Sequence, residues 1–213
     1  MIDPAGARLY AYHRALRDAA ATGSTTITSQ ALAGLLGHAF SSTQIRKDLA
    51  SLGTLGRRGC GYAINPLVSQ LELVLGLEQD WRIAIAGFGY LGHALATFIT
   101  ARESRFRIGA IFDRSPAVIG TPWNGLAVAD ITHLEELVQH ADCNIGILAV
   151  PAASAAPIAQ RMAGAGIRAI LNFAPVTLRL RAPVAVRNID LAGELSILTH
   201  ALTNADVQAQ EQA

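Results

Sequence analysis

Apolar residues recur at every third or fourth position in three successive stretches of the N-terminal region, and this spacing predicts three amphipathic helices. Their apolar positions are Leu9, Tyr12, Leu16 and Ala19 in the first stretch, Leu32, Leu35 and Leu36 in the second, and Ile45, Leu49 and Leu52 in the third. Gly23 and Gly37 follow the first two stretches, at positions where glycine commonly ends a helix. We therefore expect a small helical domain at the N-terminus.

The third stretch has the features of a helix that presents polar side chains to a partner. Ser41 and Gln44 form a capping-box pattern, in which each side chain can satisfy a backbone N–H of the first turn. On a helical projection Thr43 and Lys47 lie opposite the apolar face, and Gln44 and Arg46 lie on its flanks.

Glycines bracket two arginines directly after the third stretch, in the segment 56–62. This spacing predicts a tight β-hairpin that carries Arg57 and Arg58. Three helices followed by a basic hairpin is the order of a winged helix-turn-helix domain, in which the third helix enters the DNA major groove and the wing reaches phosphates or the minor groove. Asn65-Pro66 is expected to break the chain before a connecting helix that carries Leu67.

From Arg82 onward, short apolar runs alternate with helical stretches. The runs that predict strands are 83–86, 108–112, 145–150, 169–173 and 184–186. Continuous apolar runs separated by helices are typical of a parallel sheet covered on both faces, so this part is expected to be α/β. A last helix from Leu191 to about Leu202 is expected to precede a frayed polar tail.

A glycine fingerprint follows the first of these strands and opens a helix. It reads Gly87-Phe88-Gly89-Tyr90-Leu91-Gly92, and such a turn lets the backbone approach a pyrophosphate at a helix N-terminus. Asp113 ends the next strand, about 20 residues later, where a carboxylate can accept hydrogen bonds from an adenosine ribose and repels a 2′-phosphate. The pattern favours NAD(H) over NADP(H), and Arg114 is the neighbour that argues the other way.

Composition narrows the function classes. The chain has 213 residues, 51% of them hydrophobic, and a net charge of +1, which suits two small globular domains and no polycation. Up to Asn65 seven basic residues stand against three acidic ones, an excess that fits a nucleic-acid-binding domain. Of the acidic residues, Asp48 is expected to form a local ion pair rather than to read a base.

The cysteine spacing and the hydropathy pattern predict that the chain has no metal site, no disulfide and no membrane span. Cys60 and Cys143 lack the spacing of a zinc site or a disulfide framework, and the histidines show no metal-ligand spacing. No uncharged run is long enough for a membrane span. We expect a cytoplasmic protein with reduced thiols, no metal and no membrane association.

Two blocks resemble a known family. Gln44-Ile45-Arg46-Lys47-Asp48-Leu49 with the segment 56–62 resembles the winged helix of the Rex family of bacterial redox-sensing transcriptional repressors, and Ile170-Leu171-Asn172-Phe173-Ala174-Pro175 continues the pattern. The resemblance covers about residues 8–203. It implies a homodimer with a winged-helix domain (1–78), a Rossmann-like NAD(H)-binding domain (79–190), and a terminal helix and tail (191–213) that are exchanged with the partner.

The resemblance also implies roles for single residues. DNA contacts would come from Ser41, Thr43, Gln44, Arg46, Lys47, Arg57 and Arg58. NADH or NAD+ would be held as a regulatory ligand by Gly87, Phe88, Gly89, Tyr90, Leu91, Gly92, Asp113 and Arg114, and near its pyrophosphate and nicotinamide by Val150, Pro151, Asn172, Phe173, Ala174 and Pro175. Arg14 and Asp190 match an ion pair of the DNA-competent state, and Phe98 replaces a tyrosine common in that network.

Two other functions fit part of the sequence. One is an NAD-dependent oxidoreductase with an accessory domain, but the one lysine, Lys47, lies in the other domain, which excludes a Tyr-x-x-x-Lys dehydrogenase. The other is a sensor of a different nucleotide, because Asn172–Pro175 also resembles CoA-binding Rossmann domains. The sequence favours a repressor that leaves palindromic operator DNA when NADH binds, and not an enzyme.

Overall fold

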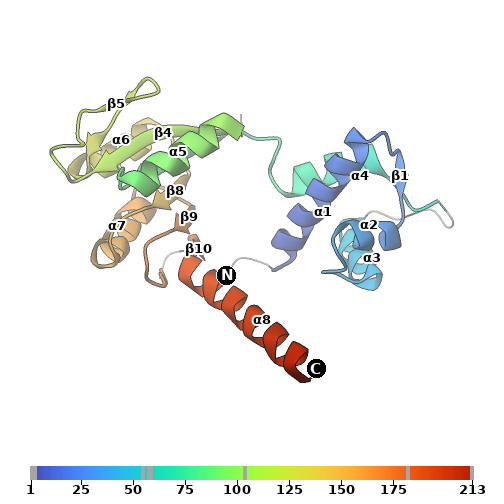
Figure 1. The fold of residues 1–213 in the computed structure, drawn as a ribbon. Coiled ribbons are helices and arrows are strands. Elements are labelled where there is room, and N and C mark those ends of the chain that lie inside the picture. The colour runs from blue at the N-terminus through green and yellow to red at the C-terminus, as the bar shows by residue number, and fades with distance from the viewer. Residues whose placement is uncertain (1–3, 54–55, 57–59, 103–104, 181–182, 212–213) are drawn as a thin grey trace. The chain divides into compact units, whose positions relative to one another are not determined.

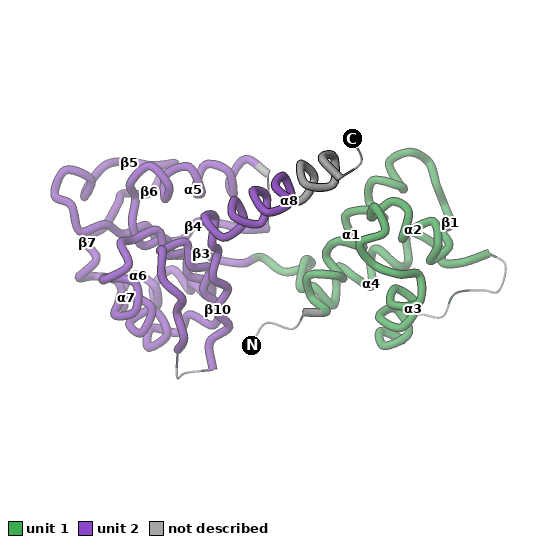
Figure 2. The backbone as a smooth tube through the Cα atoms, turned by 60° about the horizontal axis from the view of Figure 1, so that its bottom comes forward, with its two compact units in different colours: residues 1–80 green, residues 81–213 purple. Residues whose placement is uncertain are grey.

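The structure is a computed structural model that describes residues 4–53, 56, 60–102, 105–180 and 183–211 (Figure 1). The chain divides into two compact units, residues 1–80 and 81–213, which Figure 2 colours separately. Each unit has its own hydrophobic core, so each is described by itself.

Helices dominate the first unit. Its elements are α1 (Pro4–Ala21), β1 (Thr26–Ile27), α2 (Ser29–Leu35), α3 (Ser42–Ser51), β2 (Tyr62–Ala63) and α4 (Ile64–Val74). The apolar positions expected of the three helices meet in one core, in which Tyr12, Leu32 and Ile45 are fully buried together with Leu71 of α4. Leu35 is the exception: its expected place on the core face of α2 was wrong, because it is the last residue of α2 and is 60% exposed. The predicted helical domain is confirmed.

Side-chain caps fix the starts of α2 and α3. Thr28 Oγ1 accepts a hydrogen bond from Ala31 N at 3.1 Å, and Ser41 Oγ accepts one from Gln44 N at 3.1 Å. The reciprocal arm of the expected capping box was wrong, because Gln44 Nε2 donates to Asp48 Oδ1 at 2.8 Å instead. A hydrogen bond to a carboxylate is stronger than one to a neutral backbone group, which explains the choice.

The two short strands close the helical core of the first unit. β1 and β2 pair antiparallel, with Ile27 opposite Tyr62. Gly61 has a φ of +78°, and a Cβ there would collide with the Ile27 carbonyl oxygen, so this approach requires glycine. Arg57 and Arg58, predicted for the wing, lie outside the described residues.

The expected chain break at Asn65-Pro66 was wrong. Both residues lie in the first turn of α4, which begins at Ile64. The backbone N–H groups of a first helical turn have no intrahelical acceptor, so proline's missing N–H removes no helical bond there.

Six parallel strands form the main sheet of the second unit, in the order β10-β9-β8-β3-β4-β7. The strands are β3 (Trp81–Ala86), β4 (Phe106–Asp113), β7 (Ala129–Asp130), β8 (Ile145–Leu148), β9 (Ala169–Asn172) and β10 (Ala185–Asn188). The predicted parallel α/β class is confirmed. The order reverses at β3, which has β4 on one side and β8 on the other, and ligands of open α/β sheets bind at the carboxyl ends beside such a reversal.

Helices cover both faces of this sheet (Figure 1). Residues of α5 (Tyr90–Arg102) pack on one face with Ile83 and Ile85, and residues of α6 (Leu134–His140) and α7 (Ala152–Gly164) pack on the other with Ala84 and Ala86. Alternate residues of β3 thus serve opposite cores, which explains its continuous apolar run. The sequence did not predict the two-residue strands β5 (Pro122–Trp123), β6 (Leu126–Ala127) and β7, or the 3₁₀ helix η1 (Ile131–His133).

The last helix, α8 (Leu191–Glu211), is longer than expected. The predicted end of this helix near Leu202 was wrong, because alanine, glutamine and glutamate favour helix beyond it and neither glycine nor proline interrupts it. Fraying of the polar tail stays a prediction. Leu191, Leu195, Leu198 and Leu202 form an apolar stripe that is 59–67% exposed. We call these four residues the α8 stripe.

Three further observations concern membrane, metal and thiol chemistry. Within the described ranges no helix combines the length and apolarity needed to cross a bilayer. The described histidine, cysteine and acidic residues form no cluster suited to a metal ion. Cys60 is exposed and Cys143 is buried; both are free thiols, and burial raises the pKa of Cys143 to about 11.

Candidate nucleotide cleft and candidate DNA interface

The three glycines of the fingerprint have three different environments. Gly87 has a φ of +90°, and a Cβ there would collide with the Ala149 carbonyl oxygen. A Cβ on Gly92 would collide with the carbonyl oxygen of Gly87. A Cβ on Gly89 would meet nothing within 4 Å. The outer glycines therefore build the turn, whereas the middle one leaves its backbone open to a ligand.

Asp113 holds this turn from the carboxyl end of β4. Its Oδ2 accepts a hydrogen bond from Phe88 N at 2.7 Å, and its Oδ1 accepts bonds from Arg114 N and Ser115 N at 2.8 Å each. A carboxylate has about four acceptor positions, so these three bonds leave capacity for another donor. The side chain is half-buried at the edge of the sheet.

A cleft of about 470 Å³ opens between this turn and α7. Of the predicted ligand residues, Gly87, Gly89, Asp113, Arg114, Val150 and Pro151 line it. It is also lined by residues that the sequence did not single out: Ile131, Ala149, Ala153, Ser154, Pro157, Ile158 and Arg161. Five of these lie on one face of α7, and the spacing 153–154, 157–158 and 161 is the signal that could have found them.

The other predicted residues of the fingerprint lie away from the cleft lining. The Phe88 ring is buried and packs edge-on against Trp123 and beside His93, while its backbone N–H serves Asp113. Tyr90 is fully exposed and Leu91 is 41% exposed on α5. Gly92 is buried beneath the turn.

Asn172 acts as an internal brace. Its Nδ2 donates to Val176 O at 2.7 Å and Asn188 Oδ1 at 2.9 Å, and its Oδ1 accepts from Ala174 N at 3.0 Å. The residue is fully buried, so it positions the segment that carries Phe173, Ala174 and Pro175 at the carboxyl end of β9 rather than lining the cleft itself.

An ion pair to α6 holds Arg161, which lines the cleft. Arg161 Nε and Nη2 donate to the two carboxylate oxygens of Glu135 at 2.6 Å each, and Nη2 also reaches Thr132 O at 3.2 Å. This two-point bond lowers the pKa of Glu135 to about 2 and fixes the plane of the guanidinium.

Helix α3 exposes four of the residues predicted to contact DNA. Ile45 and Leu49 are fully buried, whereas Ser41, Thr43, Arg46 and Lys47 are exposed. Arg46 Nη2 donates to Thr43 Oγ1 at 3.1 Å. Gln44 is half-buried and turned toward Asp48, so its amide is engaged within the unit.

A buried carboxylate ties α3 to α1. Arg8 donates to Asp48 Oδ2 through Nε at 2.7 Å and to Oδ1 through Nη2 at 2.9 Å, and the Tyr12 hydroxyl donates to Oδ2 at 2.9 Å. With Gln44, these groups form what we call the Asp48 cluster. The expected ion pair of Asp48 is confirmed, but its expected local partner was wrong, because Arg8 lies 40 residues away on α1. The Arg8 hydrogen bonds lower the pKa of Asp48, and burial raises the pKa of Tyr12.

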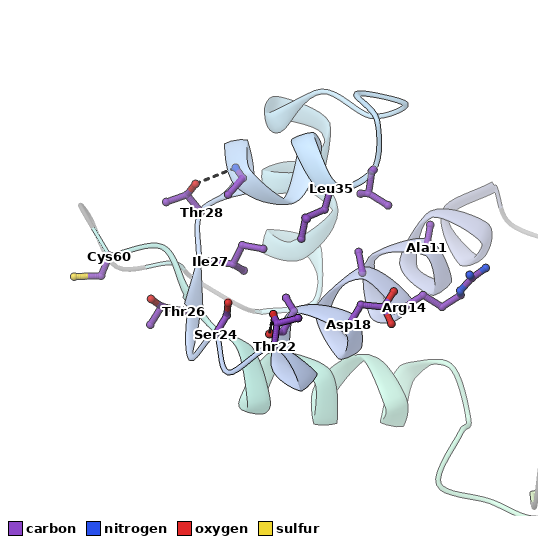
Figure 3. A pocket seen from close by; sticks show the side chains of 14 residues that line it. Ala11, Arg14, Asp18, Thr22, Ser24, Thr26, Ile27, Thr28, Leu35 and Cys60 are labelled. Atoms are coloured by element: carbon purple, nitrogen blue, oxygen red, sulfur yellow. Dashed lines mark hydrogen bonds between the residues drawn. The ribbon is translucent and has the colours of Figure 1, made fainter.

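A second concavity, of about 780 Å³, lies in the first unit between α1, β1 and α2 (Figure 3). Arg14, Asp18, Ile27, Leu35 and Cys60 are among its lining residues. We call it the α1 groove. Of the residues predicted for a switch, Arg14 lies in this groove, whereas Phe98 on α5 and Asp190 before α8 are exposed residues of the second unit.

Known proteins resemble the chain over nearly its whole length. Redox-sensing transcriptional repressors named Rex are 44% identical over 192 residues in Desulfitobacterium hafniense, covering 90% of each chain, and 39% identical over 197 residues in Thermotoga maritima, covering 92% of this chain and 93% of that one. The chain belongs to the Rex family.

Solved structures and family models agree with the Rex assignment. The crystal structure of RSP, a Rex-family repressor, in complex with β-NAD+ and operator DNA has a TM-score of 0.88 at 30% identity and covers 100% of this chain and 97% of that one. RSP in complex with β-NADH has a TM-score of 0.86. Family models match residues 3–50 as a putative DNA-binding protein N-terminus and residues 78–176 as a CoA binding domain.

Proposed function

We propose that this Rex-family protein is a homodimeric transcriptional repressor that binds operator DNA and releases it when NADH occupies the second unit. The observation that carries the proposal is the open Gly89 turn beside Asp113, in one chain with a recognition helix that exposes Arg46 and Lys47. RSP, its relative, has been crystallised with NADH and with NAD+ and operator DNA. Such a regulator works where bacterial DNA lies, in the cytoplasm.

The lining of the cleft suits a dinucleotide. The open backbone at Gly89 can receive a pyrophosphate, which a Cβ would exclude, and Asp113 keeps acceptor capacity for a ribose. Gly87, Asp113 and Arg114 would hold the adenylate half. Val150 and Pro151 line the cleft, whereas the segment 173–175 does not. Together they would lie near the nicotinamide, where an apolar surface favours the neutral reduced ring over the cationic oxidised one.

DNA recognition is assigned to α3 and the wing. Arg46 and Lys47 would contact bases and phosphates of the major groove, assisted by Ser41 and Thr43, and Arg57 and Arg58 would contact DNA from the wing. Gln44 would assist only through its Oε1, because its Nε2 donates to Asp48. Lys47→Ala is expected to weaken operator binding by about 1–3 kcal/mol for each protomer and to leave NADH affinity unchanged. Loss of both activities would contradict this assignment.

The dimer is assigned to α8. The four exposed leucines of the α8 stripe form an apolar surface that favours burial against a partner. The α1 groove has apolar walls and also carries Arg14 and Asp18. We expect α8 of a second copy to be exchanged, which would bring Asp190 to Arg14 and place Phe98 at the interface. Leu198→Asp should convert the dimer to monomers in sedimentation, with the exposed Glu194→Gln as control.

The decisive experiment is a gel shift with the full chain on a palindromic duplex recovered by selection from random DNA. NADH should release the duplex, and NAD+, NADPH and CoA should do so far less well. Binding linkage requires DNA to weaken NADH affinity by the same factor, which calorimetry can measure. If CoA releases the duplex at a lower concentration than NADH does, CoA replaces NADH as the assigned ligand. Equal DNA binding with and without saturating NADH would overturn the proposal.

A further inference from the structure

The Asp48 cluster holds one side chain of the candidate DNA surface in a defined orientation. Arg8 donates two hydrogen bonds to the Asp48 carboxylate, and the Tyr12 hydroxyl and Gln44 Nε2 donate one each. A carboxylate has about four acceptor positions, so these donors use all of them. The Arg8 hydrogen bonds also lower the pKa of Asp48, and its carboxylate is therefore ionised and has no proton to donate.

An ionised carboxylate permits only one orientation of the Gln44 amide. The amide nitrogen donates hydrogen bonds and the amide oxygen accepts them, so the nitrogen must face Asp48 and Oε1 must face away from it. Throughout the described ranges Gln44 Oε1 accepts no hydrogen bond, and this oxygen is not fully buried. Gln44 therefore presents a hydrogen-bond acceptor, in a fixed place, to a partner at the start of α3.

The position of this acceptor on α3 suits the recognition of a base edge. Gln44 is the third residue of α3, and the N-terminal residues of a recognition helix are those that contact base edges in the major groove. Adenine and cytosine present an exocyclic amine there, N6 or N4, which donates. Guanine and thymine present an oxygen instead, O6 or O4, which accepts. Such an oxygen would face Gln44 Oε1 as a second acceptor, with no proton between the two atoms.

We propose that Gln44 is a specificity-determining residue whose Oε1 accepts a hydrogen bond from the exocyclic amine of an adenine or cytosine in each operator half-site, and that the Asp48 cluster sets this preference by holding the amide. The inference rests on the proposed function, because it takes α3 as the recognition helix. Arg46 and Lys47 can only donate, and such side chains select guanine or bind phosphate. The fixed acceptor adds a second class of base to the operator.

The test measures which bases the full chain accepts at each position of its selected palindromic duplex. Each of the four bases is placed in turn at every position of one half-site, and gel shifts at one fixed salt concentration give the affinities. For wild type, one position should favour adenine and cytosine over guanine and thymine by about tenfold, the value of one mismatched contact. In Gln44→Met a weakly accepting sulfur replaces the amide, and this preference should fall to about twofold or less, while the preferences at the other positions persist.

Gln139→Met, at an exposed glutamine of α6, is the matched control and should keep every wild-type preference. In wild type, NMR should show slower hydrogen exchange at Gln44 Nε2 than at Gln139 Nε2, because a hydrogen bond to a carboxylate protects the N–H. Equal exchange would overturn the role of the Asp48 cluster. If Gln44→Met keeps the wild-type preference at every position, or weakens binding to all base pairs equally, the inference is wrong and the proposed function stands. Absence of duplex binding by wild type would overturn both.

Discussion

The helices beside the two candidate sites start in opposite ways, although elsewhere α4 of the first unit has no side-chain cap and Asp190 caps α8 of the second. In the first unit the chain's own side chains close α2 and α3, through Thr28 and Ser41. In the second unit α7 starts after Pro151 without a side-chain cap among the described residues, and α5 starts on the glycine turn. In a first turn without a side-chain cap, the backbone N–H groups can donate to a bound anion. A side-chain cap already accepts a hydrogen bond from one of these groups.

This difference indicates where each unit keeps its chemistry. The first unit projects side chains from a closed convex helix, and the Asp48 cluster holds that helix in place. The second unit offers a concave surface in which the glycine turn faces α7, and the missing side chain of Gly89 leaves open space. Substitutions should therefore act by removing atoms in the first unit and by adding atoms in the second.

The largest effect is expected from a methyl group at Gly87. Gly87→Ala requires a positive φ in a residue with a Cβ and drives that atom into the Ala149 carbonyl, which should destabilise the second unit by about 3 kcal/mol and abolish NADH binding. Both tryptophans of the chain, Trp81 and Trp123, lie in this unit, so tryptophan fluorescence can follow its unfolding.

Gly89→Ala sharpens that result. Its Cβ meets nothing within 4 Å, so stability should remain that of wild type, while NADH affinity falls about tenfold to a hundredfold because the methyl group fills the pyrophosphate space. Gly164→Ala at the end of α7, also in open space, should change neither quantity. Unchanged NADH affinity in Gly89→Ala would remove the glycine turn from the ligand site.

In the first unit the largest effect is expected from loss of a carboxylate. Asp48→Ala leaves Arg8 and the Tyr12 hydroxyl without their acceptor in a buried place, which should cost about 3 kcal/mol and weaken DNA binding by disordering α3. Amide hydrogen exchange on α3 measures the loss. Glu78→Gln, at an exposed carboxylate, is the control. Wild-type protection of the α3 amides in Asp48→Ala would show that the Asp48 cluster does not hold α3.

The same carboxylate gives the first unit an acid dependence. Its pKa is lowered in the folded chain, chiefly by Arg8, so its contribution is fully present above the unfolded carboxyl pKa of about 3.9 and is lost as the pH falls through the lower folded value. The stability of the first unit should decline below about pH 4, and Asp48→Ala should flatten that decline.

What the sequence predicted well was local. The apolar runs of β3 and β4, the helical stripe of α3 and the glycine spacing each depend on neighbours within a few residues, and each was confirmed in the fold. Even the ion pair of Asp48 could be expected from its position, although its partner Arg8, 40 residues away, could not.

What the sequence missed depends on distant segments meeting. Arg161 and Glu135 are 26 residues apart and pair only because α6 and α7 share one face of the sheet. Asn172 belongs to the motif Asn172–Pro175, yet its side chain donates hydrogen bonds to Val176 and Asn188. This role can be recognised only once β9 and β10 are known to pair. The length of α8 beyond Leu202 was missed because the apolar periodicity that predicts a helix stops there.

The smallest predicted effect concerns Ser41, which caps α3 and is also predicted to contact DNA. Two substitutions distinguish these roles. Ser41→Ala removes the cap of α3 and should cost the first unit about 1 kcal/mol, as Thr28→Ala should by uncapping α2. Ser41→Asp keeps a capping oxygen and should preserve stability, but its charge would repel a phosphate and weaken operator binding. Hydrogen exchange and gel shifts distinguish the variants. If Ser41→Asp binds DNA as well as wild type does, Ser41 only closes the helix, and the first unit's polar surface begins at Thr43.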